Sequence, residues 1–205
     1  MFSWETYPQL DAPGLLHAFS LRGSDAPDLL PSLLRPSIAA LGWGEQAVVE
    51  AEQPHGNGVY VVDSGDDEKV MPGVDALVTF SPRVVLAIRA ADCGPVFFHD
   101  PVRKAVAVAH SGRKGTEANI VGETMKTLVA SGCRAGDVRV FLGPCIRPPH
   151  YEVDFAAEIG RQAWAAGVAD YADSGIDTAA NVSRYYSYRA EKGKTGRMWA
   201  VAMLE

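Results

Sequence analysis

The sequence lacks the features that define several specialised classes of protein. Only three of its 205 residues are cysteine, and none of them forms a Cys-x-x-Cys pair, so neither a disulfide framework nor a zinc finger is expected. Lysine and arginine never form a run, and the net charge is −6, which argues against a nucleic-acid polymer as a partner. No apolar stretch is long enough to span a bilayer, so we expect no membrane partner.

Signatures of targeting and of common enzyme families are also missing. Met1 is not followed by a basic segment and an apolar stretch, so we expect no signal peptide and a cytoplasmic location. The chain has no Walker motif and no glycine-rich dinucleotide fingerprint. A Gly-x-Ser-x-Gly elbow is absent too, which disfavours a serine hydrolase.

The composition that remains is that of a globular protein. Hydrophobic residues make up 47% of the chain and charged residues 21%, and no linker or repeat interrupts it, so we expect one domain over residues 1–205. Apolar patterns predict strands at 75–79, 84–90, 96–100, 105–110 and 138–142, helices at 28–41, 120–131 and 151–166, and a final hairpin of residues 185–189 and 198–203. Because several strands follow one another without intervening helices, an α+β fold with mixed sheets is predicted.

A recurring pattern places a reactive residue beside glycine where a buried strand ends. It occurs as Pro54-His55-Gly56, Asp92-Cys93-Gly94 and His110-Ser111-Gly112. Loops at strand ends are where a rigid scaffold displays functional groups, and glycine lets a ligand approach closely. His55, Cys93 and His110 are therefore the candidate site residues.

The residue types leave three interpretations open. Two histidines and a cysteine match a catalytic zinc site with three protein ligands and one open position. The same residues could form a Cys–His nucleophile pair in which Cys93 is activated as thiolate. The third interpretation is structural, with a buried cysteine and two hydrogen-bonded histidines, and the spacing of 38 and 17 residues does not decide among them.

Four cations are candidates for binding an anion. Strand alternation places Arg89 on the same face as Cys93. Arg22 stands next to Gly23 and Ser24, and Arg113 and Lys114 precede a predicted helix. The alternative for each is a solvated surface residue.

Taken in order, the motifs resemble the YfiH/laccase-domain family, whose members include purine nucleoside enzymes and were formerly called polyphenol oxidoreductases. The resemblance runs from about residue 15 to 200. It is carried by His17-Ala-Phe-Ser-Leu-Arg22, Gln53-Pro-His-Gly56, Asp75-Ala-Leu-Val-Thr79, Ala91-Asp-Cys-Gly-Pro-Val96, Ala107-Val-Ala-His-Ser-Gly112, Gly143-Pro-Cys-Ile146, Tyr151-Glu-Val153, Tyr186-Ser-Tyr-Arg189 and Thr195-Gly-Arg197.

The resemblance implies a sandwich of mixed sheets with flanking helices. It also implies zinc at His55, Cys93 and His110, which match the family's metal and catalytic positions, with copper disfavoured. The implied activities are phosphorolysis of adenosine, inosine and methylthioadenosine, and deamination of adenosine. The partners would then be a small nucleoside and phosphate, with Arg22, Arg89 and Lys114 serving the phosphate.

One departure and two alternatives accompany this resemblance. The family usually has His-Ala-Gly-Trp-Arg-Gly, where this chain has Arg113 and Lys114 in place of the Trp-Arg pair. The alternatives are a Cys–His amidase acting on a peptidoglycan precursor, and a zinc module without activity. A laccase is disfavoured, because multicopper oxidases need more histidines than the five present here and cluster them in His-x-His pairs.

Overall fold

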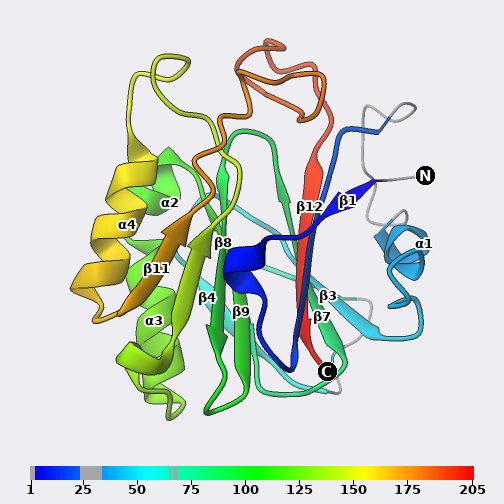
Figure 1. Cartoon of the computed structure of the whole chain (residues 1–205), viewed down its shortest axis with the longest axis vertical. Coiled ribbons are helices and arrows are strands. Elements are labelled where there is room, and N and C mark those ends of the chain that lie inside the picture. The colour runs from blue at the N-terminus through cyan, green and yellow to red at the C-terminus, as the bar shows by residue number, and fades with distance from the viewer. Residues whose placement is uncertain (1–2, 24–33, 65, 67–68) are drawn as a thin grey trace.

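The computed structural model describes residues 3–23, 34–64, 66 and 69–205, and these form a two-sheet sandwich with helices on its outer faces (Figure 1). The strands are β1 (Trp4–Glu5), β2 (Leu15–Ser20), β3 (Ala47–Ala51), β4 (Val59–Val62), β5 (Lys69–Met71), β6 (Ala76–Thr79), β7 (Val84–Ala90), β8 (Gly94–Asp100), β9 (Ala105–Ser111), β10 (Arg139–Leu142), β11 (Asp170–Asp173) and β12 (Met198–Leu204). The helices are α1 (Leu34–Ala39), α2 (Arg113–Glu117), α3 (Ile120–Ala130) and α4 (Phe155–Ala165), with short 3-10 turns at Pro8–Leu10 and Ala135–Asp137.

Each sheet has six strands and mixes parallel with antiparallel pairs. The first sheet has the order β1-β2-β12-β7-β3-β5, and the second has the order β11-β10-β8-β9-β6-β4. The three consecutive strands β7, β8 and β9 are almost entirely buried, which explains why their sequences are continuous apolar runs rather than alternating ones. This arrangement confirms the predicted α+β class with mixed sheets packed as a sandwich.

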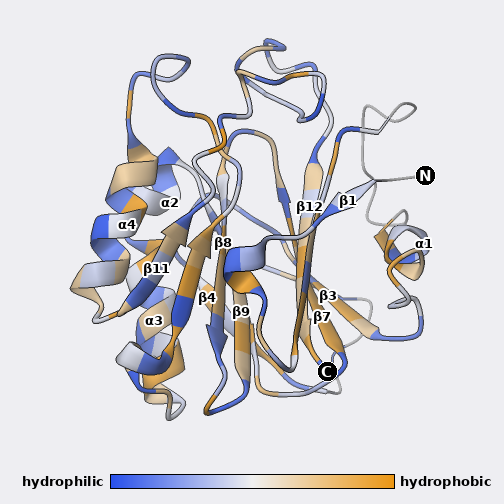
Figure 2. Ribbon diagram, viewed as in Figure 1, coloured by the Kyte–Doolittle hydropathy of each residue, from blue (hydrophilic) through white to orange (hydrophobic). Residues whose placement is uncertain are grey.

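Side-chain alternation along these strands builds three apolar layers. Leu86 and Ile88 of β7 face Phe97 of β8 and Phe141 of β10 in the layer between the sheets. The neighbouring residues point outward: Val96 and Phe98 of β8 pack against α3 and α4, while α1 covers the outer face of the first sheet. Figure 2 shows the hydrophobic residues concentrated on the strands, whereas the loops at the upper end are mostly hydrophilic.

The two longer helices begin at side-chain caps and bury one face. The Asn119 side chain accepts the N–H of Gly122 at the start of α3, and the Asp154 side chain accepts the N–H of Ala157 at the start of α4. The face of α3 toward the sheet carries Ile120, Val121, Thr124, Met125 and Leu128 at helical spacing.

Local patterns predicted most elements, but two predictions differ from the structure. The hairpin of residues 185–189 and 198–203 is wrong: residues 185–189 form no strand, and β12 pairs with β2 and β7 instead. The helix predicted at 28–41 is described only from Leu34, as α1, and its earlier part and Ser24 lie outside the described residues. Among the described residues, no helix is long and apolar enough to cross a membrane.

Candidate functional site

Strand register brings three of the site residues to one end of the second sheet. β8 and β9 pair antiparallel with Gly94 opposite Ser111, so Cys93 lies just beyond this pair, next to Gly112. β6 pairs with β9 on its other side, and the main-chain carbonyl of Asp75 accepts the N–H of His110 at 2.8 Å. Asp75, Cys93 and His110 are thus placed by neighbouring strands, although 35 residues separate the first from the last.

His55 reaches the same place from a tightly turned loop after β3. Its φ is +66°, and that of Gln53 is +67°, both in the left-handed region that side-chain-bearing residues rarely adopt. The Asp75 carboxylate stabilises this turn by accepting the main-chain N–H of His55 at 3.0 Å and that of Gly56 at 2.6 Å. The loop conformation therefore depends on a residue from a different strand.

The two histidines and the cysteine form one compact group of donors. Their donor atoms all lie within 4.8 Å of one another, and the imidazole rings of His55 and His110 meet edge-on with centroids 4.8 Å apart. A Cβ on Gly112 would lie 2.4 Å from the Cys93 sulfur, so the thiol occupies space that only glycine leaves free. The three side chains differ in exposure: His110 is buried at 3% exposure, Cys93 is partly buried and His55 is exposed.

Asp75 joins this group in the structure, although the sequence did not mark it as a candidate site residue. Its side chain is fully buried, and one oxygen accepts a hydrogen bond from Nδ1 of His110 at 2.9 Å. In the neutral imidazole of His110, donation by Nδ1 leaves the lone pair on Nε2, where a metal ion could bind. The signal that could have found Asp75 is its position immediately before an apolar strand that lies between the two histidines in sequence.

The charges of this group shift its ionisation. Burial raises the pKa of the Cys93 thiol, but the charge and hydrogen bonds of His110 and His55 outweigh it and lower that pKa to about 6. Burial lowers the pKa of His110, but Cys93 and Asp75 outweigh it and raise that pKa to about 9. For Asp75, hydrogen bonds from His110 and Gly56 overcome the opposing effect of burial, so its pKa falls below the usual range.

A cavity of about 900 Å³ opens above the donor group. Its apolar surface comes from Ala91 and Ile146 together with aromatic rings, which suits a planar organic ligand. Its charged and aromatic lining residues are Glu52, Arg89, Asp92, Arg113, Tyr151, Phe155, Tyr188, Arg189, Lys192 and Arg197. Five of these are cations and two are carboxylates, so the cavity concentrates positive charge in a protein of net charge −6.

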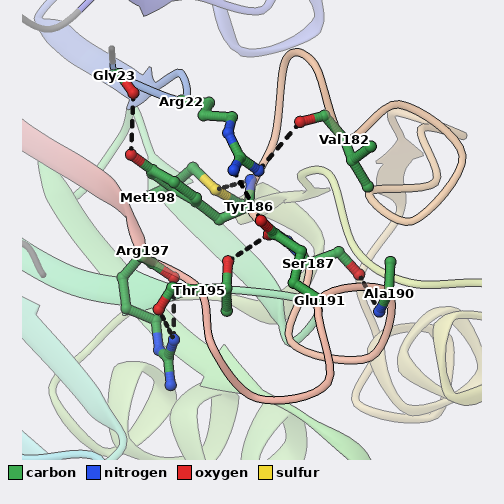
Figure 3. A network of polar contacts seen from close by, with 11 residues as sticks. Arg22, Gly23, Val182, Tyr186, Ser187, Ala190, Glu191, Thr195, Arg197 and Met198 are labelled. Carbon is green, nitrogen blue, oxygen red and sulfur yellow. Dashed lines mark hydrogen bonds and ion pairs between the residues drawn. The ribbon is translucent and has the colours of Figure 1, made fainter. Parts of the chain in front are cut away.

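The structure divides the predicted anion-binding residues. Arg89 and Arg113 line the cavity, and the Arg89 guanidinium is paired with Glu50 at 2.6 Å. Arg22 and Lys114 are not among the residues that line it. Arg22 instead pairs with Glu191 at 2.7 Å, which Figure 3 shows.

Three further lining cations, Arg189, Lys192 and Arg197, were not proposed from the sequence. They lie on the segment before β12, which the local pattern assigned in part to a hairpin. The available signal was the alternation of aromatic residues and glycine with arginine in Tyr186-Ser-Tyr-Arg189 and Thr195-Gly-Arg197.

Comparison with known proteins yields one family and a set of named relatives. The family model described as "Multi-copper polyphenol oxidoreductase laccase" matches residues 19–163 and 153–205. A protein named purine nucleoside phosphorylase from Deinococcus radiodurans is 33% identical over 241 aligned residues, covering 95% of this chain and 92% of that protein.

Solved structures resemble the fold over nearly its whole length. YlmD from Geobacillus stearothermophilus has a TM-score of 0.88 at 23% identity, covering 97% of this chain and 94% of that one. The Bacillus licheniformis protein YfiH has a TM-score of 0.84 at 23% identity, covering 97% of this chain and all of that one. At these identities the likeness establishes the fold alone.

Proposed function

Because this chain belongs to the multi-copper polyphenol oxidoreductase laccase family, in which its relatives are named purine nucleoside phosphorylases, we propose that it is a purine nucleoside phosphorylase. The observation that carries the proposal is the compact group of His55, Cys93 and His110 at the base of a cation-lined cavity. The laccase description suits this chain poorly, because the group offers three donors to one ion and the chain has five histidines in all.

The donor group fits a zinc ion. Two imidazoles and a thiol within 4.8 Å match the three-ligand sets that zinc enzymes use, and the Asp75 carboxylate holds His110 as the outer partner of such a ligand does. A zinc ion bound to His55, Cys93 and His110 would supply Lewis-acid chemistry and activate water at neutral pH. A multicopper centre is disfavoured, because no second group of metal-ligating side chains stands beside this one in the described part of the chain.

The cavity residues have defined tasks in phosphorolysis. An oxygen of the hydrogenphosphate dianion attacks C1′ of the ribose, the bond from C1′ to N9 breaks, and the proton that the hydrogenphosphate gives up ends on a nitrogen of the leaving purine. The cations of the lining bind the phosphate dianion and orient it toward C1′. The rings of Tyr151, Phe155 and Tyr188 offer surfaces on which the purine and ribose pack.

We extend the proposal to adenosine, inosine and methylthioadenosine as substrates, and to deamination of adenosine. These substrates share the purine and ribose and differ at the purine 6-position and the 5′-position. Deamination needs an activated water, and the donor group with its metal is where the cavity could supply one. A single domain spanning residues 1–205 would carry both reactions.

The deciding experiment follows release of hypoxanthine from inosine with and without phosphate. We expect release to require phosphate and to fall at least about 100-fold in His110→Ala and after removal of metal by a chelator, with recovery on adding zinc. Release that proceeds equally without phosphate would refute the phosphorylase proposal. If the turnover equals that of a triple variant at His55, Cys93 and His110, the chain is a zinc module without activity.

The contacts of Cys93 favour a second candidate, a Cys–His amidase. Asp75 contacts His110, and His110 contacts Cys93, which is the order of groups that activates a thiol nucleophile. This candidate requires the metal-free protein to hydrolyse amide substrates, such as peptidoglycan precursors, and to be inactivated by alkylation of Cys93. Zinc would inhibit that activity, whereas it would restore phosphorolysis.

A further inference from the structure

The cations that line the cavity differ in whether a carboxylate already neutralises them. Arg89 pairs with Glu50, and Arg113 pairs with Glu117 four residues further along α2. A third pair joins Arg189 to Glu152. Positive charge that is paired in this way contributes less to the attraction of an incoming anion.

Lys192 and Arg197 are the two lining cations that remain. Within the described part of the chain, neither has a carboxylate at ion-pair distance. One guanidinium nitrogen of Arg197, Nη1, donates to the carbonyls of Thr195 at 3.2 Å and Gly196 at 2.9 Å, so backbone atoms hold the group in place. Within the described ranges no hydrogen bond occupies its Nε or Nη2, which leaves both donors for a ligand, and the guanidinium carbon lies 5.6 Å from the centroid of the Tyr188 ring.

The segment that bears both residues, residues 187–197, is fastened to the sheet by Glu191. One carboxylate oxygen pairs with Arg22 at 2.7 Å, and the other accepts the N–H of Ser187 at 3.1 Å and the hydroxyl of Thr195 at 2.5 Å (Figure 3). Glu191 thereby ties both ends of the segment to Arg22, two residues after the end of β2. Figure 3 shows the Arg197 guanidinium turned away from this carboxylate, so Glu191 does not neutralise it.

Arg22 is held by three separate contacts. Its Nη1 donates to the carbonyl of Val182 at 3.1 Å, and its guanidinium lies 4.7 Å above the Tyr186 ring. Together with the ion pair to Glu191, these contacts hold the guanidinium against residues 182–191. Arg22 therefore contacts this part of the chain and does not line the cavity.

We propose that Lys192 and Arg197 form the site that binds inorganic phosphate in this cavity, and that Arg22 is a positioning residue that holds their segment through Glu191. The proposal rests on the phosphorylase function and names its anion subsite. It assigns to Arg22 an indirect role, whereas the sequence resemblance had it serving the phosphate itself. Two cations without acidic partners, brought together in one cavity, are best stabilised by an anion between them.

The first test measures binding of inorganic phosphate to the zinc-loaded protein by isothermal titration, together with the KM for phosphate in the inosine assay. Arg197→Ala is expected to weaken phosphate binding about 10–100-fold, and Lys192→Ala about tenfold. This is the range expected for the loss of one charge-assisted hydrogen bond. Arg197→Lys should recover part of the loss, which guards against a folding defect. Lys194→Ala is the matched control: it removes a cation of the same segment that does not line the cavity, and phosphate binding should stay within about twofold.

The second test is a double-mutant cycle of Arg22→Met and Glu191→Gln. If Arg22 acts through Glu191, each change should raise the KM for phosphate by a similar factor, with a smaller effect on kcat, and the double variant should be no worse than either. If Arg22 contacts phosphate directly, Arg22→Met should weaken phosphate binding, whereas Glu191→Gln should leave phosphate binding unchanged or make it tighter.

The outcomes separate this proposal from the function on which it rests. Phosphate binding that is unchanged in both Arg197→Ala and Lys192→Ala overturns the subsite, even if phosphorolysis is confirmed. Phosphate binding that is lost in these variants supports the subsite, even if inosine is not cleaved and the phosphorylase proposal fails. An additive cycle at Arg22 and Glu191 overturns the positioning role.

Discussion

Replacing Asp75 by asparagine tests how the donor group is held. The carboxylate accepts three hydrogen bonds, from the N–H groups of His55 and Gly56 and from Nδ1 of His110. The asparagine amide can keep two of them if its oxygen takes the position of Oδ1, which serves His55 and His110. Its NH2 group then faces the N–H of Gly56, which in the wild type donates a hydrogen bond of 2.6 Å to the carboxylate of Asp75. Two donors therefore oppose each other.

The expected cost follows from these contacts. One buried donor left without an acceptor costs about 1–3 kcal/mol, so the free energy of unfolding of the metal-free protein should fall by that amount. Loss of the carboxylate behind a metal-binding histidine weakens metal binding by about 10–100-fold, equivalent to about 1.4–2.7 kcal/mol. Zinc affinity should therefore fall, whether or not activity is measured.

The assay is zinc affinity by chelator competition, with the unfolding free energy measured by denaturant titration. Asp100→Asn is the matched control, because Asp100 is 1% exposed and lies at the other end of β8, about 20 Å along the strand from Cys93. It should leave zinc affinity within about twofold. A folded Asp75→Asn protein that binds zinc as tightly as the wild type would refute the assigned role of Asp75.

Three more predictions concern the same site and the segment above it. In chelator-treated protein, alkylation of Cys93 should have its half-maximal rate near pH 6, because the histidines lower the thiol pKa to about 6; His110→Ala should move the midpoint upward, and an unshifted midpoint would contradict this cause. The hydrogen bond from Arg22 lowers the pKa of Glu191 to about 2 from its usual 4.5, so Glu191 stabilises the fold above pH 4.5 and loses this effect as the pH falls toward 2. The difference in unfolding free energy between wild type and Glu191→Gln should shrink over that range, and a constant difference would be evidence against the ion pair. Gly112→Ala would place a Cβ 2.4 Å from the Cys93 sulfur and should lower zinc affinity at least about tenfold. The circular dichroism spectrum should show that this variant keeps the fold. In the control Gly136→Ala the added Cβ meets no atom within 4 Å, so zinc affinity should not change.

Local patterns predicted the buried strands well because their environment leaves one choice of residue type. β7, β8 and β9 are covered on both faces, so apolar residues fill nearly every position and the run itself marks the strand. The predicted hairpin failed for a related reason. Tyr185 and Tyr186 are buried at 2% and 3% exposure, so they read as part of a strand, yet they pack into the core from an irregular segment.

The candidate site also combines features that the local sequence predicts with features that depend on the tertiary fold. His55, Cys93 and His110 could be chosen as candidates from the sequence because each stands within two residues of a glycine near the end of a strand. Whether a given cation lines the cavity could not be read locally, since the positions of Arg22 and Arg197 depend on how residues 187–197 fold over the end of the sandwich.

The sequence by itself thus predicted the three candidate residues of the donor group and the strands near them, because burial and turn geometry restrict residue choice one position at a time. Only the tertiary structure decided that Asp75 supports both histidines, that Arg22 is engaged by Glu191, and that Lys192 and Arg197 have no acidic partner among the described residues. The partners in these contacts are as much as 169 positions apart in the sequence. Electrostatic interaction depends on distance in space, and a local sequence pattern carries no information about that distance.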